Sequence, residues 1–430
     1  MMEANYPAHE SYKPSGYDWV GDVPAHWAVE KLGTSLRAVS VKNRPDLPLL
    51  SITREKGVIE RDLDDEESNH NFIPDDLSGY KVLRAGQFGM NKMKAWQGSY
   101  GVSQHTGIVS PAYFIFDFTK EIDPAFFNRA IRSKLYVSFF GSASDGVRIG
   151  QWDLNKSRMR EIPLLVPPLP EQRAIAAFLD DKCAKIDGAV KIKEDQIALL
   201  RERRQIIIQD AVTRGLNPAA PMKDSGIDWI GQIPAHWDVR RNFTLFRESK
   251  RSGNANLPVL SVSIHSGVST EELSEEENIR SAIKIEDRTF YKEVLPGFVA
   301  YNMMRAWQGG IGSVSVHGMV SPAYVVAEPI AEIDATYFEL LYRTPVYIWQ
   351  MDAASKGITD FRKRLYWDDF RNLVTILPPM AEQREIIQSI EAMSAKINSG
   401  IAIKERQIAA LKEYKTSLIN AAVTGKIKVI

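Results

Sequence analysis

Two copies of one pattern fill almost the whole chain, and this internal duplication limits the possible folds most strongly. Residues Ser15–Trp27 read SGYDWVGDVPAHW, and Ser225–Trp237 read SGIDWIGQIPAHW, 210 positions later. Pro167–Gly215 aligns without gaps with Pro378–Lys426, 211 positions later, with 21 identities in 49 positions. Because this period is far longer than that of a solenoid repeat, we expect each copy to be a domain with an appendage.

Each copy has two parts of different composition. The first part, residues 15–166 and 225–377, combines short β-type runs with frequent turn residues, which predicts a mixed α+β domain. The second part, residues 167–215 and 378–426, has prolines only at its start, which predicts one long helix. We expect residues 1–14 to be a flexible N-terminus and residues 216–224 to be a linker.

The two predicted helices carry an apolar stripe in alternating steps of four and three residues. The stripe runs from Leu179 to Ala211 in the first helix and from Ile390 to Ala422 in the second. Such a stripe is typical of a coiled coil, although each helix could instead be buried on its own domain. A helix of 45 residues spans about 68 Å, far more than one such domain needs. We therefore expect an antiparallel two-helix coiled coil with pseudo-twofold symmetry.

Composition and missing motifs exclude several classes of function. The chain has 54 basic and 54 acidic residues, so it does not bind polyanions over its whole surface, although local basic patches remain possible. Its single cysteine, Cys183, excludes a disulfide framework and a cysteine zinc site. No phosphate-binding loop, metalloprotease or hydrolase motif occurs, so we expect a non-catalytic chain. His26 and His236 lie in matching turns and are expected to pack, with no metal site.

The repeated motifs resemble those of the specificity (S) subunit of type I restriction–modification systems. The resemblance covers about residues 13–428. It rests on SGxDWxGxxPAHW at the start of each half, on the central AWQG and VSPAY runs, and on PPxxEQR leading into a long helix that ends AVT. Each motif occurs twice and in the same order.

This resemblance implies a fold and a function. It implies two target recognition domains, residues 15–166 and 225–377, each reading one half of a bipartite site in double-stranded DNA. The long helices would set the spacing and hold two modification (methyltransferase) subunits, and restriction (translocase–nuclease) subunits would join them. S-adenosylmethionine, ATP and magnesium would belong to those partners, so no cofactor is expected here. We expect a cytoplasmic protein with no membrane partner, since no run of 18 apolar residues occurs.

Two other functions remain open from the residues alone. One is a free-standing DNA methyltransferase that contains such recognition domains, although its catalytic motifs are missing. The other is a coiled-coil scaffold that displays two ligand-binding domains, for instance for carbohydrate, which the aromatic AWQG loops would permit.

The candidates for reading bases lie in loops that differ between the two copies but are flanked by similar sequence in both. Arginine and lysine suit the guanine edge, and polar side chains in glycine-rich loops suit phosphates or base edges. Trp96 and Trp307 are shared by both copies, so we expect them to pack. The first copy offers Thr53, Arg54, Lys56, Lys92, Lys94, Gln97, Ser99, Tyr100 and Arg148. The second offers Ser263, His265, Arg305, Gln308, Lys356, Thr359, Arg362 and Lys363.

Overall fold

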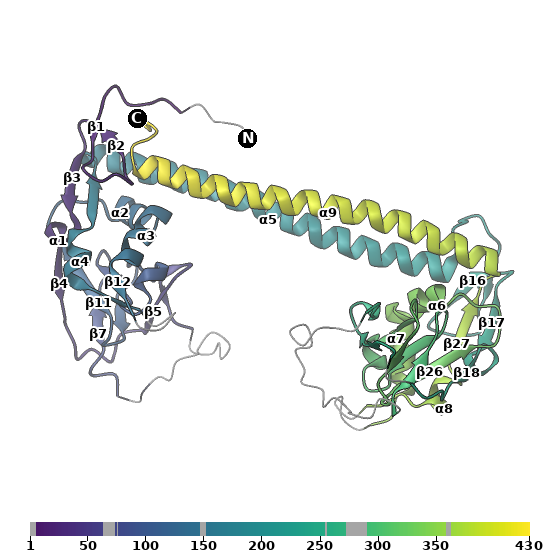
Figure 1. Ribbon diagram of the computed structural model, residues 1–430. Coiled ribbons are helices and arrows are strands. Elements are labelled where there is room, and N and C mark those ends of the chain that lie inside the picture. Colours follow the sequence, from purple (N-terminus) through teal and green to yellow (C-terminus); the bar gives the residue numbers. More distant parts are fainter. Residues whose placement is uncertain are drawn as a thin grey trace. The chain divides into compact units, whose positions relative to one another are not determined.

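The structure is a computed structural model that describes residues 6–62, 74, 76–146, 152–253, 256–271, 290–357 and 363–430. The chain forms two compact units, each with one mixed domain and about half of both long helices (Figure 1). Unit 1 comprises Met1–Glu194 and Glu405–Ile430, and unit 2 comprises Asp195–Lys404. The division falls inside both helices, so the units follow the duplication seen in the sequence.

Unit 1 contains a β-rich domain with short helices on its sheets. Its strands are β1 (Tyr12–Pro14), β2 (Asp22–Pro24), β3 (Ala28–Lys31), β4 (Leu36–Val39), β5 (Leu50–Thr53), β6 (Gly57–Glu60), β7 (Lys81–Leu83), β8 (Phe88–Met90), β9 (Tyr100–Val102), β10 (Gly107–Val109), β11 (Phe114–Phe118), β12 (Ser144–Asp145), β13 (Asp153–Leu154) and β14 (Pro163–Val166). Its helices are α1 (Leu32–Ser35), η1 (Ala95–Gln97), α2 (Pro124–Ile131), α3 (Lys134–Ser142), α4 (Lys156–Glu161) and the first half of α5 (Leu169–Arg214).

Unit 2 repeats this arrangement. Its strands are β15 (Met222–Asp224), β16 (Gln232–Pro234), β17 (Asp238–Arg241), β18 (Phe246–Glu248), β19 (Val259–Leu260), β20 (Val262–Ser263), β21 (Gly267–Val268), β22 (Lys292–Val294), β23 (Val299–Asn302), β24 (Ile311–Ser313), β25 (Gly318–Val320), β26 (Tyr324–Pro329) and β27 (Val374–Leu377). Its helices are η2 (Asn242–Thr244), η4 (Ala306–Gln308), α6 (Ala335–Tyr342), α7 (Pro345–Ala354), α8 (Trp367–Phe370) and the first half of α9 (Met380–Val423).

The largest sheets of the two domains share one topology, as the duplication in the sequence predicts. The largest sheet has the strand order β4-β11-β8-β9 in unit 1 and β18-β26-β23-β24 in unit 2, antiparallel throughout. The strand that leads into each long helix pairs with an early strand, β14 with β3 and β27 with β17. The α+β class expected from the sequence is confirmed.

The core of each domain continues into the ends of the long helices. In unit 1 one buried cluster contains Trp27 of the PAHW turn, Leu179 of α5 and Leu418 of α9. In unit 2 the equivalent cluster contains Trp237, and both indoles have no exposed surface. The tryptophan repeated at the start of each copy therefore fixes its domain to the helix pair.

Within each unit the halves of α5 and α9 lie side by side and run antiparallel (Figure 1). In unit 1, Lys415 Nζ contacts Asp187 Oδ2 at 2.6 Å, and in unit 2, Arg204 Nη1 donates to Asn398 Oδ1 at 3.1 Å. The apolar stripe is largely buried, with Ile186 only 8% exposed. Two of its basic interruptions, Arg204 and Lys415, therefore have polar partners on the neighbouring helix.

The shared PPxxEQR run has a structural role at the start of each long helix. Gln172 Nε2 donates to Pro167 O at 2.8 Å, and its Oε1 accepts from Asp123 N at 2.8 Å. Gln383 makes the same two bonds to the backbone of Pro378 and Asp334. One buried glutamine thus connects the start of the long helix to the N-cap residue of α2 in unit 1 and of α6 in unit 2.

Some boundaries differ from those expected. The long helices cover 169–214 and 380–423, a few residues shorter at each end than expected. Residues 12–14, expected in a flexible segment, form β1 and pair with β2, and residues 222–224 of the expected linker form β15 and pair with β16. Among the described residues, no helix has the length and apolar character needed to cross a membrane.

Candidate nucleic-acid interface

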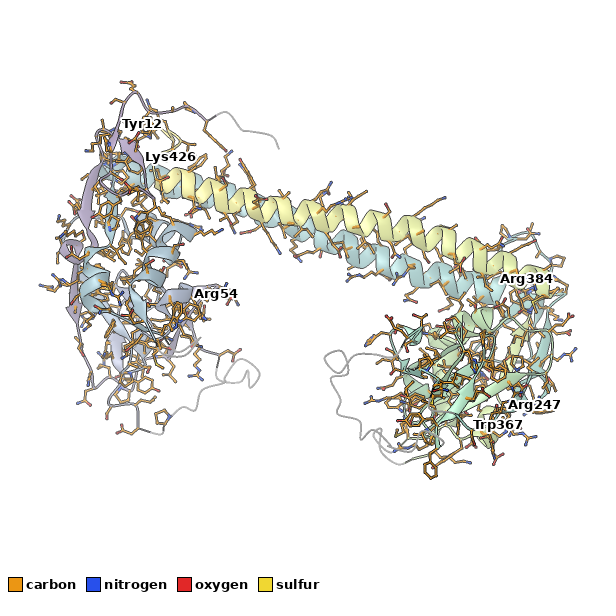
Figure 2. The ribbon with its side chains drawn as sticks, viewed as in Figure 1. Tyr12, Arg54, Arg247, Trp367, Arg384 and Lys426 are labelled. Atoms are coloured by element: carbon orange, nitrogen blue, oxygen red, sulfur yellow. The ribbon has the colours of Figure 1, made fainter. Side chains whose placement is uncertain are left out.

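The first pair of candidate loops consists of two hairpin tips. In unit 1, Thr53 ends β5, and its Oγ1 accepts from Lys56 N at 3.1 Å and donates to Gly57 O at 3.2 Å. This turn leaves Arg54 and Lys56 exposed, and Figure 2 labels Arg54. In unit 2, Ser263 Oγ accepts from His265 N at 3.0 Å, and His265 is exposed. Thr53 pairs with Gly57 as Ser263 pairs with Gly267, so the two hairpins share a register and carry different side chains at their tips.

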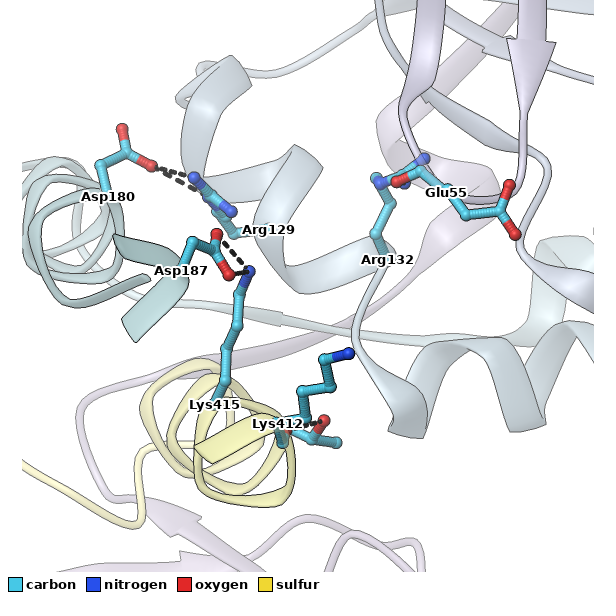
Figure 3. A network of polar contacts seen from close by, with 8 residues as sticks. Glu55, Arg129, Arg132, Asp180, Asp187, Lys412 and Lys415 are labelled. Carbon is cyan, nitrogen blue, oxygen red and sulfur yellow. Dashed lines mark hydrogen bonds and ion pairs between the residues drawn. The ribbon is translucent and has the colours of Figure 1, made fainter. Parts of the chain in front are cut away.

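A partly buried arginine fixes each tip to its domain. Arg132, at the end of α2, donates from Nη1 to Tyr100 O at 2.7 Å and from Nη2 to Arg54 O at 3.0 Å and Glu55 O at 2.7 Å (Figure 3). Burial lowers the pKa of its guanidinium. Arg343 makes equivalent bonds to the carbonyls of the second tip, Ile264 and His265. Sequence reasoning missed both arginines, although they occupy equivalent positions in the two copies.

The second pair of loops surrounds the AWQG turn. Gly98 and Gly309 end the short helices η1 and η4 with φ of 91° and 88°, which a residue with a side chain rarely adopts. In unit 1, Lys94 is exposed, Gln97 is partly buried, and Lys92 Nζ contacts Asp153 Oδ2 at 2.9 Å.

In unit 2 the same turn places two candidate residues in contact with each other. Arg305 Nη1 donates to Gln308 Oε1 at 2.7 Å. The indole of Trp307 donates to Met304 O at 3.0 Å, and that of Trp96 lies 5.0 Å from the Trp152 ring. Both shared tryptophans are partly buried and pack, as expected.

Two candidates in this frame are too buried to reach a base. Ser99 is 2% exposed and Tyr100 has no exposed surface. Tyr100 belongs to β9 and points into the core against Phe140, and burial raises the pKa of its hydroxyl well above the usual range. A strand alternates its faces, so a difference between the copies at this position reflects packing. We leave both residues out of the proposed interface.

The basic residues of the third pair of loops already face carboxylates. Lys356 Nζ lies 2.7 Å from Asp369 Oδ1, and this hydrogen bond raises the pKa of Lys356. Lys363 Nζ donates to Asp352 Oδ1 at 2.7 Å and lies 5.0 Å from the centre of the Trp307 ring. The remaining candidates of this pair lie outside the described residues, namely Arg148, Thr359 and Arg362.

A group of lysines in unit 1 was not predicted. Lys81 Nζ donates to Tyr113 O at 2.7 Å, and its pKa is lowered by burial and then by the charges of Lys42, Lys156 and Lys92. Lys156 also lies 4.2 Å from the centre of the Phe114 ring. Four ammonium groups close enough to affect one titration make a local positive potential, which attracts a phosphate backbone.

The structure groups some candidates and separates others. In unit 1, Arg54 and Gln97 line one hollow together with Arg132 and with Thr416 of α9. In unit 2, His265 and Arg343 line the equivalent hollow. Lys92 belongs instead to the lysine group around Lys81. A separate group, His9, His26 and Glu171, has the spacing of metal ligands and lies outside these loops.

Comparisons with known proteins give two related curated sequences. The "Putative type I restriction enzyme MjaX specificity subunit" of Methanocaldococcus jannaschii is 21% identical over 302 residues, which is 65% of this chain and 63% of that protein. The match therefore spans less than two thirds of that relative. The type I restriction enzyme EcoKI specificity subunit of Escherichia coli is 23% identical over 343 residues, covering 75% of this chain and 68% of that protein. No family model matches the chain.

Solved structures share the fold over nearly the whole chain. A chain from a structural study of complex assembly and conformational transition of the type I R-M system matches with a TM-score of 0.64 and 14% identity, covering 93% of this chain and 98% of that one. The HsdS subunit from Thermoanaerobacter tengcongensis matches with a TM-score of 0.52 and 15% identity, covering 94% and 98%. In its duplicated motifs, its two related sequences and this common fold, the chain is similar to the specificity subunits of type I restriction–modification systems.

Proposed function

We propose that this chain is the DNA-reading subunit of a type I restriction–modification complex. Each domain reads one half of a bipartite site, and the long helices set the spacing and hold two methyltransferase subunits. Translocase–nuclease subunits join this core. The chain itself catalyses no reaction, and S-adenosylmethionine, ATP and magnesium bind to its partners. The complex acts in the cytoplasm, where it meets the DNA.

One observation carries this proposal. Two domains with the same strand order present loops of the same backbone design, and these loops carry different side chains at their tips. The two hairpins close at equivalent pairs, Thr53 with Gly57 and Ser263 with Gly267. At their tips, Arg54 and Lys56 of the first copy correspond to Ile264 and Ser266 of the second. A hairpin whose backbone is the same in both copies, while the exposed side chains at its tip differ, suits two half-sites with different bases.

The charges of the loops support DNA binding that depends on partners. The side chains of Lys92, Lys356 and Lys363 contact carboxylates of their own domain. Ion pairs that remain partly open to solvent contribute little to stability, so a phosphate can displace these carboxylates at a small cost. Because the chain has no net charge, we expect weak binding of DNA by the chain alone and tight binding by the assembled complex.

The helices carry a repeated apolar position that suits two identical partners. Ile192 of α5 is 57% exposed, and Ile403 of α9, its equivalent in the second copy, is 44% exposed. An apolar side chain held at the same place in both units provides a docking point for each methyltransferase. Single Ile192→Glu and Ile403→Glu variants should each lose one methyltransferase, measured by mass photometry. If both variants still bind two, the helices do not hold the partners.

Exchanging one hairpin tip tests the reading role. The variant Arg54→Ile, Glu55→His and Lys56→Ser places the second tip on the first domain. We expect the bases read at one half-site to change, while the other half-site and the spacer stay the same. Methylation mapping of cells that express the variant with its methyltransferase measures this.

The matched control for this exchange is Lys31→Ala on β3, which removes an ion pair with Glu161 away from the loops. It should leave both half-sites unchanged. If the tip exchange gives active methylation with the original two half-sites, the hairpin tip does not read bases.

A further inference from the structure

Two imidazoles and a carboxylate converge where the chain enters α5 in unit 1. His26 Nε2 lies 2.8 Å from Glu171 Oε2, and His9 Nε2 lies 3.7 Å from Glu171 Oε1. One donor atom from each of the three residues lies within 4.8 Å of the other two. The side chains of His9 and Glu171 are only 5% and 7% exposed, whereas that of His26 is 48% exposed. The group therefore has a buried base and an open side.

The imidazole of His9 has a buried nitrogen that forms no hydrogen bond within the part of the chain that the structure describes. Its Nε2 has no hydrogen-bond partner among the described residues, and it faces Glu171 at a distance too long for a hydrogen bond. The backbone of Ile427 forms a hydrogen bond with the other side of this imidazole. A ring held in this way directs its Nε2 lone pair at the group, as in histidines that bind metals.

The second copy provides an internal comparison, because it lacks one member of the group. His236 Nε2 lies 2.7 Å from Glu382 Oε2, and Trp237 Nε1 donates to the same oxygen at 3.0 Å. Ala219 stands where the first copy has His9. In the described residues of unit 1, by contrast, the indole nitrogen of Trp27 has no such partner. In unit 2, His236, Glu382 and the indole of Trp237 thus hold the turn without a further imidazole. The imidazole of His9 is therefore not needed to hold the equivalent turn in unit 1.

We propose that His9, His26 and Glu171 bind a divalent transition-metal ion of the zinc type. Imidazole nitrogen and carboxylate oxygen are ordinary zinc ligands at about 2.0–2.2 Å, which places neighbouring ligand atoms of a tetrahedron about 3.3 Å apart. The separation of 3.7 Å between His9 and Glu171 is close to this value. The exposed ring of His26 can rotate to complete the set, and water fills the fourth position on the open side.

The bound ion joins three segments that are distant in sequence. His9 belongs to the segment before β1, His26 to the turn after β2, and Glu171 to the first turn of α5. Next to the group, Lys428 N donates to Pro7 O at 2.7 Å, so the segment after α9 is held as well. A metal ion here stabilises the junction between the first domain and the helix pair. Its role is structural and not catalytic.

Zinc titration of the full chain tests the proposal. After treatment with a chelator, calorimetry with zinc chloride should show one high-affinity ion per chain. The variant His9→Ala should weaken this binding at least about tenfold, and so should His9→Gln, which retains a polar side chain. Alanine already occupies the equivalent position in unit 2, so the scaffold tolerates it. The matched control His236→Ala removes the equivalent turn histidine and should leave zinc binding unchanged.

Hydrogen exchange gives a readout that is independent of affinity. Zinc should slow exchange in residues 6–14 of the parent chain and should have no such effect in His9→Ala. The proposal is overturned if the parent binds no zinc in the micromolar range. It is equally overturned if the two His9 variants bind zinc as the parent does, which would assign the binding to other histidines.

Discussion

The arginine that holds the first hairpin tip allows a quantitative test of how the candidate interface is positioned. In the variant Arg132→Met, the side chain keeps its length and loses all its donors. The carbonyls of Arg54 and Glu55 lose hydrogen bonds of 3.0 and 2.7 Å. A hydrogen bond to a charged group contributes about 1.5–3 kcal/mol, and water replaces part of it at the exposed tip. We therefore expect the free energy needed to open the tip to fall by about 2 kcal/mol in total.

This change corresponds to an opening equilibrium about 30-fold more favourable, because about 1.4 kcal/mol is a factor of ten. Hydrogen exchange followed by mass spectrometry should show faster exchange by about that factor in residues 50–60. Apart from β9, where the carbonyl of Tyr100 also loses a bond to Arg132, the large sheet should exchange as in the parent. In methylation assays of the assembled complex, one half-site should then be read less strictly.

A neighbouring arginine on the same helix supplies the control. Arg129 contacts Asp180 of α5 at 2.6 Å, and among the described residues its hydrogen bonds go to this carboxylate and not to the hairpin (Figure 3). The variant Arg129→Met should leave exchange in residues 50–60 unchanged. Equal exchange of this peptide in the two variants would refute the idea that Arg132 orders the tip.

Two further predictions concern the helix pair and its junction with the first domain. Four residues inserted after both Glu194 and Lys404 keep the contacts within each unit and lengthen the helix pair by about 6 Å. Methylation mapping should then show about one to two more base pairs in the spacer between the half-sites. An unchanged spacer in an active variant would contradict the proposal. Gly425→Ala should lower the free energy of unfolding by about 2–4 kcal/mol, since φ is +70° and the new methyl group would collide with Pro24. Gly16→Ala, with φ of +82° and open space, should cost only about 1 kcal/mol in the same urea titration.

Local patterns in the sequence predicted the fold well. The alternating steps of four and three residues identified the helix seam, because burial along a helix repeats with that period. The prolines before Glu171 and Glu382 indicated where the long helices start. The short β-type runs predicted mixed domains, whereas the β1 and β15 pairings were missed because three-residue strands leave too little pattern.

Contacts between residues distant in sequence were the part that could not be predicted. Lys92 faces Asp153, 61 positions away, so its charge is partly satisfied within the domain. Tyr100 was expected at the surface, because its difference between the copies was interpreted as readout. Arg132 binds a tip 77 and 78 positions earlier in the chain, and only its recurrence at Arg343 could have indicated this. Candidate residues can be chosen from their residue type and from the matching sequence around them. The orientation of their side chains depends on tertiary packing, which the sequence pattern does not reveal.

The discontinuity of unit 1 has a consequence for biosynthesis. Unit 2 is one continuous stretch, Asp195–Lys404, whereas unit 1 needs Glu405–Ile430 to complete its core. Leu418 and Val423 belong to the same buried cluster as Leu179. At about 5–20 residues per second, a ribosome takes about 10–40 s to make the 210 residues between the two parts of unit 1. During that time the first half of α5 leaves the exit tunnel without its partner, so unit 2 is the first to finish folding and the earlier-made domain is the last.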